Sequence, residues 1–217
     1  MPDLDFRVVG VEAAARGLTP LLHFRLEVTN DPATEKIHGI ILQAQVHIQS
    51  SQRPYLDQEK RQLMDLFGTP DRWGQTLRTK LWTHASVTVR PFERRADAIL
   101  PIQCTYDLNV TATKYFYALQ EGEVPLLFLF SGTVFYAGVE GKLQVQRISW
   151  DKECAFRMPV RVWQDLMEHH YPGSAWISLQ RHVFERLYAY KVDHGIPTWE
   201  ETINRLLSGP SEKIGDG

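Results

Sequence analysis

The chain has 217 residues, of which 43% are hydrophobic and 23% are charged, and its formal net charge is −2. This balance is typical of globular proteins and argues against disorder along the whole chain. Because the 24 Lys and Arg residues are scattered, we expect no nucleic-acid partner, which would need clustered cations. The longest apolar stretch, Val124 to Phe130, contains Pro125. It is far shorter than the roughly 20 residues of a membrane-spanning helix, so we expect no membrane insertion.

The amino terminus and the two cysteines predict the compartment. Residues 1–5 include acids where a signal peptide carries cations, and no long apolar segment follows, so we expect a cytoplasmic protein. Cys104 and Cys154 have no partner at metal-ligand spacing. Two reduced, largely buried thiols are therefore expected, with a disulfide as the alternative. The sequence assigns no role to either cysteine.

The first fifty residues have the two-residue period of sheet strands. Apolar and polar side chains alternate from Leu22 to Val28 and from Ile40 to Ile48, and an earlier strand spans about residues 5–11. The turn-forming cluster Asn30-Asp31-Pro32 separates the two alternating segments. The sequence therefore predicts an antiparallel hairpin that turns at this cluster.

The middle of the chain combines one helix with further strands. Apolar spacing predicts a helix over residues 57–67, with Asp57 as its N-cap and Gly68 at its end. A loop containing Arg72 and Trp73 follows. The predicted strands of this region span residues 81–89, 102–112, 124–136 and 143–149. Gly132 indicates a bulge, or the close approach of another backbone.

The last third is predicted to be helical. Pro159 suits the first turn of a helix that ends before Tyr171. Ser174 is expected to cap a second helix over residues 175–193, and a capping box at Thr198 opens a third helix that ends at Leu207. The apolar residues expected to face inward on the second helix are Leu179, Val183, Leu187 and Tyr190.

Strands that precede a run of helices are typical of an α+β protein. We predict an antiparallel β-sandwich-like core of about seven strands, with a C-terminal helical segment packed on it. Residues 1–208 form one domain in this prediction. Residues 1–150 are mainly β with one helix near 57–67, residues 151–208 are helical, and residues 209–217 form a flexible tail.

The sequence contains no motif that assigns a catalytic, cofactor-binding or metal-binding residue. It has no Gly-rich phosphate loop, and no serine or cysteine stands between the two glycines of a hydrolase elbow. We therefore predict no cofactor. His169 and His170 end a helix, where the helix dipole favours protonated histidine, and a metal site shared with His182 is the alternative. His23 and His47 are expected to meet across the sheet on a solvated face.

Arg72 and Trp73 are the candidate partner-binding residues. Both residue types are enriched at interface hot spots, and here they are adjacent in a predicted loop. In the alternative, Trp73 folds back and covers the sheet.

Several motifs in order resemble an uncharacterised bacterial family of conserved proteins associated with hydrogenase gene clusters. The resemblance covers nearly the whole chain. The motifs that carry it are Leu66-Phe67-Gly68, Arg72-Trp73-Gly74, Cys104-Thr105-Tyr106-Asp107, Gly122-Glu123-Val124-Pro125, Phe130-Ser131-Gly132-Thr133, Met158-Pro159-Val160, Tyr171-Pro172 and Pro197-Thr198-Trp199. It implies an accessory of uptake [NiFe] hydrogenases without an established activity. A second, local resemblance joins residues 132–141 to the last strand of the SecB export chaperone.

Three functions follow as hypotheses. The first is a non-enzymatic accessory or binding protein with a protein partner, assisting assembly or maturation of an uptake [NiFe] hydrogenase. The second is a SecB-like chaperone that binds unfolded segments. The third is an enzyme whose site is assembled from distant residues, with His84, Asp107 and His182 as the residues that would converge.

Overall fold

The computed structural model describes residues 2–14, 17–31, 35–107, 109–138 and 141–208. It divides into two compact units, Met1–Ser174 and Ala175–Gly217, which are described separately below. No helix in the described ranges is long and apolar enough to cross a membrane.

The first unit is built on two antiparallel sheets. One has the strand order β1 (Leu4–Ala13), β2 (Leu21–Asn30), β5 (Arg95–Gln103). The other has the order β4 (Lys80–Val89), β3 (Ile37–Ile48), β6 (Glu123–Ala137). The long strand β6 pairs with β7 (Leu143–Arg147) along its second half and with β8 (Glu153–Pro159) along its first half. The α+β class and the β-rich core predicted from the sequence are therefore confirmed.

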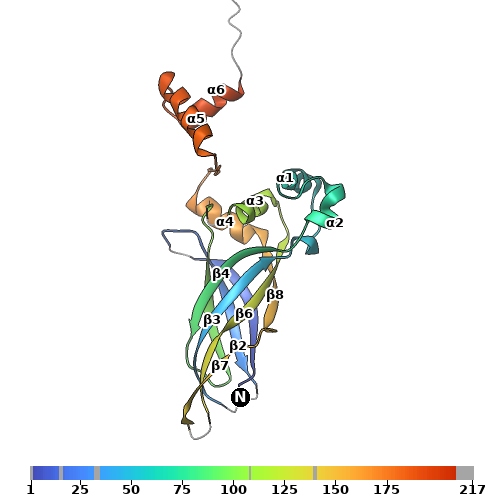
Figure 1. Cartoon of the computed structure of the whole chain (residues 1–217), viewed down its shortest axis with the longest axis vertical. Coiled ribbons are helices and arrows are strands. Elements are labelled where there is room, and N and C mark those ends of the chain that lie inside the picture. Colours follow the sequence, from blue (N-terminus) through green and yellow to red (C-terminus); the bar gives the residue numbers. More distant parts are fainter. Residues whose placement is uncertain (1, 15–16, 32–34, 108, 139–140, 209–217) are drawn as a thin grey trace, which may run out of the picture. The chain divides into compact units, whose positions relative to one another are not determined.

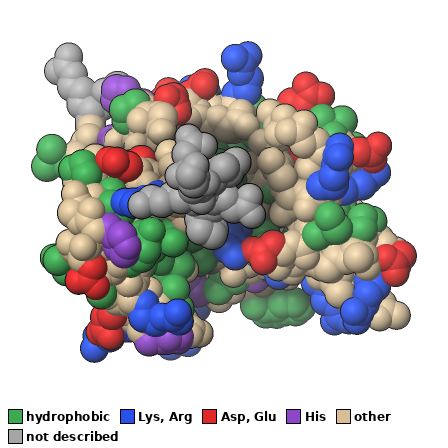
Figure 2. Space-filling model, turned by 90° about the horizontal axis from the view of Figure 1, so that it is seen from above, with side chains coloured by type: hydrophobic (Ala, Val, Ile, Leu, Met, Phe, Trp, Pro, Cys, Tyr) green, Lys and Arg blue, Asp and Glu red, His purple; other side chains and the backbone are tan. Residues whose placement is uncertain are grey.

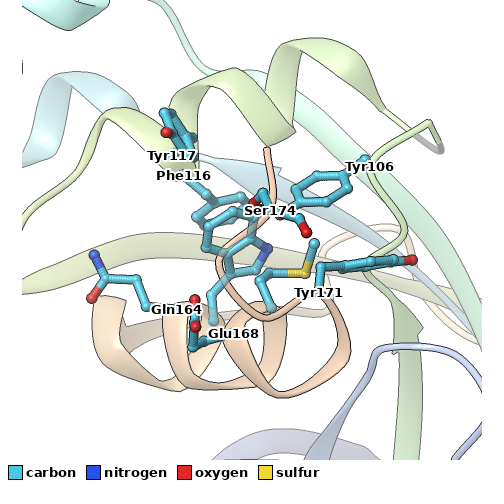
Figure 3. Close-up of a pocket in the computed structure, with 9 residues that line it drawn as sticks. Tyr106, Phe116, Tyr117, Gln164, Glu168, Tyr171 and Ser174 are labelled. Atoms are coloured by element: carbon cyan, nitrogen blue, oxygen red, sulfur yellow. Dashed lines mark hydrogen bonds between the residues drawn. The ribbon is translucent and has the colours of Figure 1, made fainter. Parts of the chain in front are cut away.

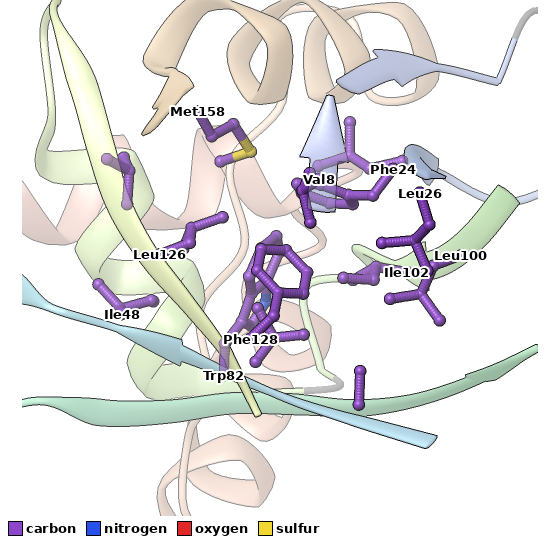
Figure 4. Close-up of a cluster of buried hydrophobic side chains, with 14 of the residues drawn as sticks. Val8, Phe24, Leu26, Ile48, Trp82, Leu100, Ile102, Leu126, Phe128 and Met158 are labelled. Carbon is purple, nitrogen blue, oxygen red and sulfur yellow. The ribbon is translucent and has the colours of Figure 1, made fainter. Parts of the chain in front are cut away.

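The two sheets face each other and enclose one hydrophobic core. β4 lies beside β5 and β1 beside β8 at the open edges, where the Val8 N–H contacts Cys154 Sγ at 3.3 Å. Phe24 occupies the centre, with its ring 5.2 Å from Phe128 and 6.3 Å from Trp82 (Figure 4). The alternation predicted for residues 22–28 and 40–48 supplies these inward side chains.

Two helices close one end of this core, opposite the end marked N in Figure 1. They are α3 (Val110–Ala118) and α4 (Val160–His170). Phe116 of α3 lies between Trp82 and Trp163, with ring centroids 4.9 and 5.3 Å away, and is 1% exposed. Burial of these rings supplies several kcal/mol of hydrophobic free energy, at roughly 25 cal/mol per Å².

A buried ion pair fixes α1 (Asp57–Phe67) against the end of α3. The Glu59 side chain is fully buried, and its carboxylate accepts hydrogen bonds from the Arg53 guanidinium at 3.0 and 3.1 Å. It also accepts from the backbone N–H groups of Leu56 at 3.0 Å and Gln120 at 2.8 Å. Four donor contacts satisfy a charge that would otherwise be costly to bury.

A short helical segment follows α1. It comprises the 3₁₀ turn η2 (Pro70–Arg72) and α2 (Trp73–Thr76), and another 3₁₀ turn, η1 (Ser50–Gln52), precedes α1. The helix predicted over residues 57–67 is confirmed, whereas the loop predicted around Arg72 and Trp73 is wrong. Thr76 Oγ1 donates to the carbonyl oxygen of Phe67 at 2.6 Å, which holds this segment against the end of α1.

The second unit contains α5 (Arg181–Asp193) and α6 (Trp199–Leu207). Gly195 has φ 63° in the turn between them, where a residue with a side chain would be strained. Thr198 caps α6 by accepting a hydrogen bond from the Glu201 N–H at 3.1 Å, as the capping box predicts. The rings of Phe184 and Tyr188 lie 5.6 and 6.1 Å from Trp199 and link the two helices.

The predicted hairpin between residues 22–28 and 40–48 is wrong. β2 pairs with β1 and β5, whereas β3 pairs with β4 and β6, so the chain crosses from one sheet to the other after Asn30. Asn30 donates to the carbonyl oxygens of Glu35 and Glu93 at 3.0 and 3.1 Å and thereby ties the crossing to the start of β5. Pro32 lies outside the described residues.

The strand predicted over residues 102–112 is also wrong. β5 ends at Gln103, and α3 begins at Val110. Asn109 accepts a hydrogen bond from the Ala112 N–H at 3.0 Å and donates to the Trp82 carbonyl at 2.8 Å. Because Asn109 caps the helix, α3 begins at Val110, although apolar and polar residues alternate in this part of the sequence.

Two boundaries in the last third differ from the prediction. Residues 153–159 form β8 and are not helical, so the described residues contain eight strands, which agrees with the prediction of about seven. The helix predicted over residues 175–193 begins at Arg181, and Ser174 Oγ donates to the Pro172 carbonyl at 3.2 Å instead of capping a helix. Val183, expected to face inward, is 39% exposed. The tail over residues 209–217 lies outside the described residues, and the single-domain organisation stays a prediction.

Lys and Arg side chains lie among Asp and Glu side chains on the face shown in Figure 2. The absence of a nucleic-acid partner stays a prediction from the sequence.

Replacing Glu59 is expected to destabilise the first unit strongly. Glu59→Ala leaves the Arg53 guanidinium, which is 6% exposed, without its carboxylate, and a broken buried pair costs about 3–5 kcal/mol. Chemical denaturation followed by circular dichroism measures this loss. Gln62→Ala, an exposed position on the same helix, is the control and is expected to change stability by less than about 0.5 kcal/mol. Equal stability of the two variants would contradict the role given to Glu59.

Gly132 is the point where β6 approaches β3 most closely, which confirms the sequence prediction of a close backbone approach. Its φ is +144°, and a Cβ at this position would collide with the Ile41 carbonyl oxygen and lie 3.2 Å from Leu42 Cα. Gly132→Ala is expected to cost at least about 1–3 kcal/mol in unfolding free energy. Gly74→Ala, where no atom lies within 4 Å, is the matched control. A Gly132→Ala variant as stable as the control would contradict the close approach of β3 and β6 at this position.

Candidate functional site

The predicted partner-binding residues Arg72 and Trp73 are placed differently by the structure. The Trp73 indole N–H donates to the Gly68 carbonyl at 2.9 Å, and its ring lies 5.3 Å from Tyr55 and 6.1 Å from Phe67. Trp73 is thus half-buried and braces the end of α1, whereas Arg72 is exposed. A partner at Arg72 and Trp73 stays a prediction.

The histidines expected to meet across the sheet do not do so. His23 pairs with Glu12 and Pro101 within the first sheet, and His47 belongs to the second. His47 instead lies near His84 of the neighbouring strand β4. Partial burial, followed by the charge of His84, lowers the His47 pKa, which disfavours protonation of His47.

The residues named for an assembled enzyme site are not shown to converge. His84 lines two pockets over β4, of about 270 and 420 Å³, and Asp107, in the turn before α3, is not among the residues that line them. His182 belongs to the second unit. The rings of His169 and His170 lie 5.2 Å apart, but no group of three metal-ligating side chains occurs in the part of the chain that the structure describes.

Both cysteines are free thiols. Cys104 is 5% exposed, and burial raises the pKa of its thiol from 9.0 to about 12. A thiol in this state stays protonated at neutral pH and is a poor nucleophile. Cys154 is half-buried at the edge where β8 meets β1.

A pocket of about 180 Å³ between α3, α4 and the turn before α3 is a candidate site because five aromatic side chains line it (Figure 3). Its aromatic walls are Tyr106, Phe116, Tyr117, Trp163 and Tyr171. The other side chains that line it belong to Gln164, Met167, Glu168 and Ser174. All nine residues lie in the first unit.

Hydrogen bonds from three elements hold the pocket together. Asn109 fixes the start of α3 to β4, and Thr113 Oγ1 donates to the Tyr106 carbonyl at 3.1 Å. Gln164 of α4 donates from Nε2 to the Leu119 carbonyl at 2.9 Å, which joins α4 to the end of α3. The pocket is therefore attached to the same elements that close the core.

The aromatic rings form two pairs. Tyr106 and Tyr171 face each other at the mouth, with centroids 4.7 Å apart and planes 34° apart. Phe116 and Trp163 are stacked at the base, 5.3 Å apart, and both are at least 96% buried. Tyr117, 61% exposed, stands at the rim. Rings at the base, mouth and rim therefore contribute to the lining, together with polar groups of Gln164, Glu168 and Ser174.

Glu168 is the charged side chain among these lining residues. Its Oε1 accepts a hydrogen bond from the Gly173 N–H at 3.0 Å, which orients the carboxylate. Burial, followed by the charges of Tyr117, Tyr171 and Glu168, raises the pKa of Tyr106. The lining thus contains one carboxyl side chain and no Lys, Arg or His.

Sequence reasoning missed this pocket because it depends on α3. The sequence placed Tyr106 in a predicted strand and Trp163 in the helix predicted after Pro159, so nothing indicated that they would share a cavity. One local signal was present: Asn109 is a good N-cap, and the apolar residues Ala112, Phe116 and Leu119 recur at helical spacing after it.

The chain belongs to DUF6084, a family of unknown function, whose model matches residues 1–214. The expectation of a family without an established activity is therefore confirmed, whereas the hydrogenase association and the SecB likeness stay predictions. A search of curated proteins gave no match.

Two solved structures show weak similarity. The CARDB domain of the PF1109 protein from Pyrococcus furiosus has 11% identity, with 72% of this chain and 91% of that chain covered and a TM-score of 0.26. A putative late embryogenesis abundant protein has 10% identity, with 73% of each chain covered and a TM-score of 0.31. Scores this low support no conclusion about function.

Proposed function

We propose that this member of DUF6084 is a non-enzymatic accessory or binding protein, and that the aromatic pocket between α3 and α4 is its recognition site. The observation that carries the proposal is the pocket lining: five aromatic residues surround a space of about 180 Å³. Aromatic residues dominate binding energetics, because one ring buries a large apolar area with few rotatable bonds.

The volume supports recognition of a small group. Pockets that hold drug-sized molecules and cofactors measure roughly 300–1,000 Å³. A space of about 180 Å³ is suited to one side chain of a protein partner or to one small head group. Tyr106, with its raised pKa, stays neutral, so the lining offers a single carboxylate and no paired acid and base.

An accessory role beside an uptake [NiFe] hydrogenase is the proposed cellular setting. It rests on the resemblance of the sequence motifs alone. Deletion of the gene in a host that has such an enzyme tests it, and unchanged hydrogen uptake and hydrogenase maturation would contradict it.

A chaperone that binds unfolded segments is the second candidate. It is favoured by the apolar side chains that the second unit exposes, among them Phe184 at 46%, Tyr188 at 54% and Leu206 at 48%. Suppression of the aggregation of denatured test proteins is the expected activity. Failure with every such protein would remove this candidate.

Removal of one aromatic ring from the pocket is expected to weaken ligand binding strongly. Tyr171→Ala removes one ring of the pair at the mouth and is expected to weaken ligand binding at least tenfold. Binding is measured by NMR on the ¹⁵N-labelled full chain, with a library of small cations, anions and neutral aromatic compounds. Resonances from α3, α4 and the Trp163 indole report on the pocket.

Trp150→Ala is the control, because this ring is 93% exposed and lies outside the pocket. It is expected to leave binding unchanged, and thermal denaturation verifies that both variants are folded. A library in which no compound shifts the pocket resonances, or binding that survives in Tyr171→Ala, would contradict the proposed site.

A further inference from the structure

Resting on the proposed function, we infer that the aromatic pocket binds an organic cation: an alkylated ammonium group or the cationic end of a Lys or Arg side chain. Three properties of the first unit carry this inference: the arrangement of the rings, the charge of the lining and the size of the space.

The rings present the surface that attracts cations. The faces of aromatic rings carry negative partial charge, and a cation within about 6 Å of a ring centroid is attracted to it. Tyr106 and Tyr171, 4.7 Å apart, form one wall, and Trp163 lies at the base. Indole is the strongest cation-binding ring among the side chains. A group bound in this space would contact rings from three chain segments.

The charge of the lining residues is negative, and His169 and His170 in the last turn of α4 do not line the pocket. Glu168 contributes a full negative charge, and no Lys, Arg or His is among the lining residues. The site also lies at the C-terminal end of α4, which carries partial negative charge from its unpaired carbonyl groups. The Gly173 N–H donates to Glu168 Oε1 and holds the carboxylate at the rim. Binding of a cation therefore costs little additional side-chain entropy at Glu168.

Anions and large neutral ligands fit this site poorly. An anion would face Glu168 and the end of the α4 dipole, which both repel it. A large planar ligand exceeds the space of about 180 Å³. An ammonium or guanidinium group matches both the charge and the volume, and either a free small molecule or a partner protein can supply it.

Calorimetric titration of the full chain with choline tests the inference. Its uncharged counterpart, 3,3-dimethylbutanol, has nearly the same shape and lacks the charge. Choline is expected to bind at least tenfold more tightly than this alcohol, since the cation–π attraction and Glu168 act only on the charged ligand. NMR shifts of the Trp163 indole locate the binding in the pocket.

The Glu168→Gln variant separates charge from shape. Glutamine retains an oxygen that can accept from the Gly173 N–H, so the pocket is expected to keep its form. Choline binding is expected to weaken about fivefold or more, with the affinity for the alcohol unchanged. Asp165→Asn is the matched control, because Asp165 is exposed on the same helix and does not line the pocket.

Peptides containing trimethyllysine or arginine, each with a neutral counterpart, identify the source of the cation. At least tenfold tighter binding of such a peptide than of choline assigns the cation to a protein partner, and equal or weaker binding assigns it to a free small molecule. Equal affinity for choline and its alcohol overturns the inference and leaves the proposed function standing. If the pocket binds neither choline nor the alcohol, and no other compound of the library, both the cation inference and the proposed function are overturned.

Discussion

The first unit depends on closing the end of its hydrophobic core. Two facing sheets bury an apolar interior along their length, but the ends stay open to water unless another element covers them. Trp82, Phe116 and Trp163 provide this cover, because α3 and α4 bring their rings together over the end of β4. Two of these rings, Phe116 and Trp163, also form the base of the pocket, so the closure of the core and the proposed recognition site share side chains.

The buried ion pair of Arg53 and Glu59 is the second requirement. Its carboxylate binds the backbone of Leu56 and Gln120, and so fixes both the start of α1 and the segment after α3. Tyr55 extends the connection, with its hydroxyl 2.9 Å from that of Tyr115. A charged group fully removed from water is tolerated because every one of these contacts is made at once. The position of α3, and with it the pocket wall, follows from this network.

Prediction from the sequence succeeded where the local spacing of apolar residues decides the structure. It failed where a contact between distant segments decides it. The alternation in residues 22–28 fixed a strand, and the spacing in residues 57–67 fixed a helix. The partners of that strand were mispredicted, because Asn30 bonds to Glu35 and Glu93 and so ends the strand without forming a hairpin. Trp73 was expected in a loop, yet its indole bonds to Gly68 and the segment becomes helical.

The sequence by itself determined the α+β class and most strand and helix positions, since each depends on residues near in the chain. It favoured free cysteines over a disulfide, and at Gly132 it indicated either a bulge or a close backbone approach. Only the tertiary structure decided the division of the strands between two sheets and the meeting of Tyr106, Trp163 and Tyr171 around one space. These residues come from a turn, a helix and the end of that helix. No periodicity relates them, because their proximity arises from how α3 and α4 pack over the core.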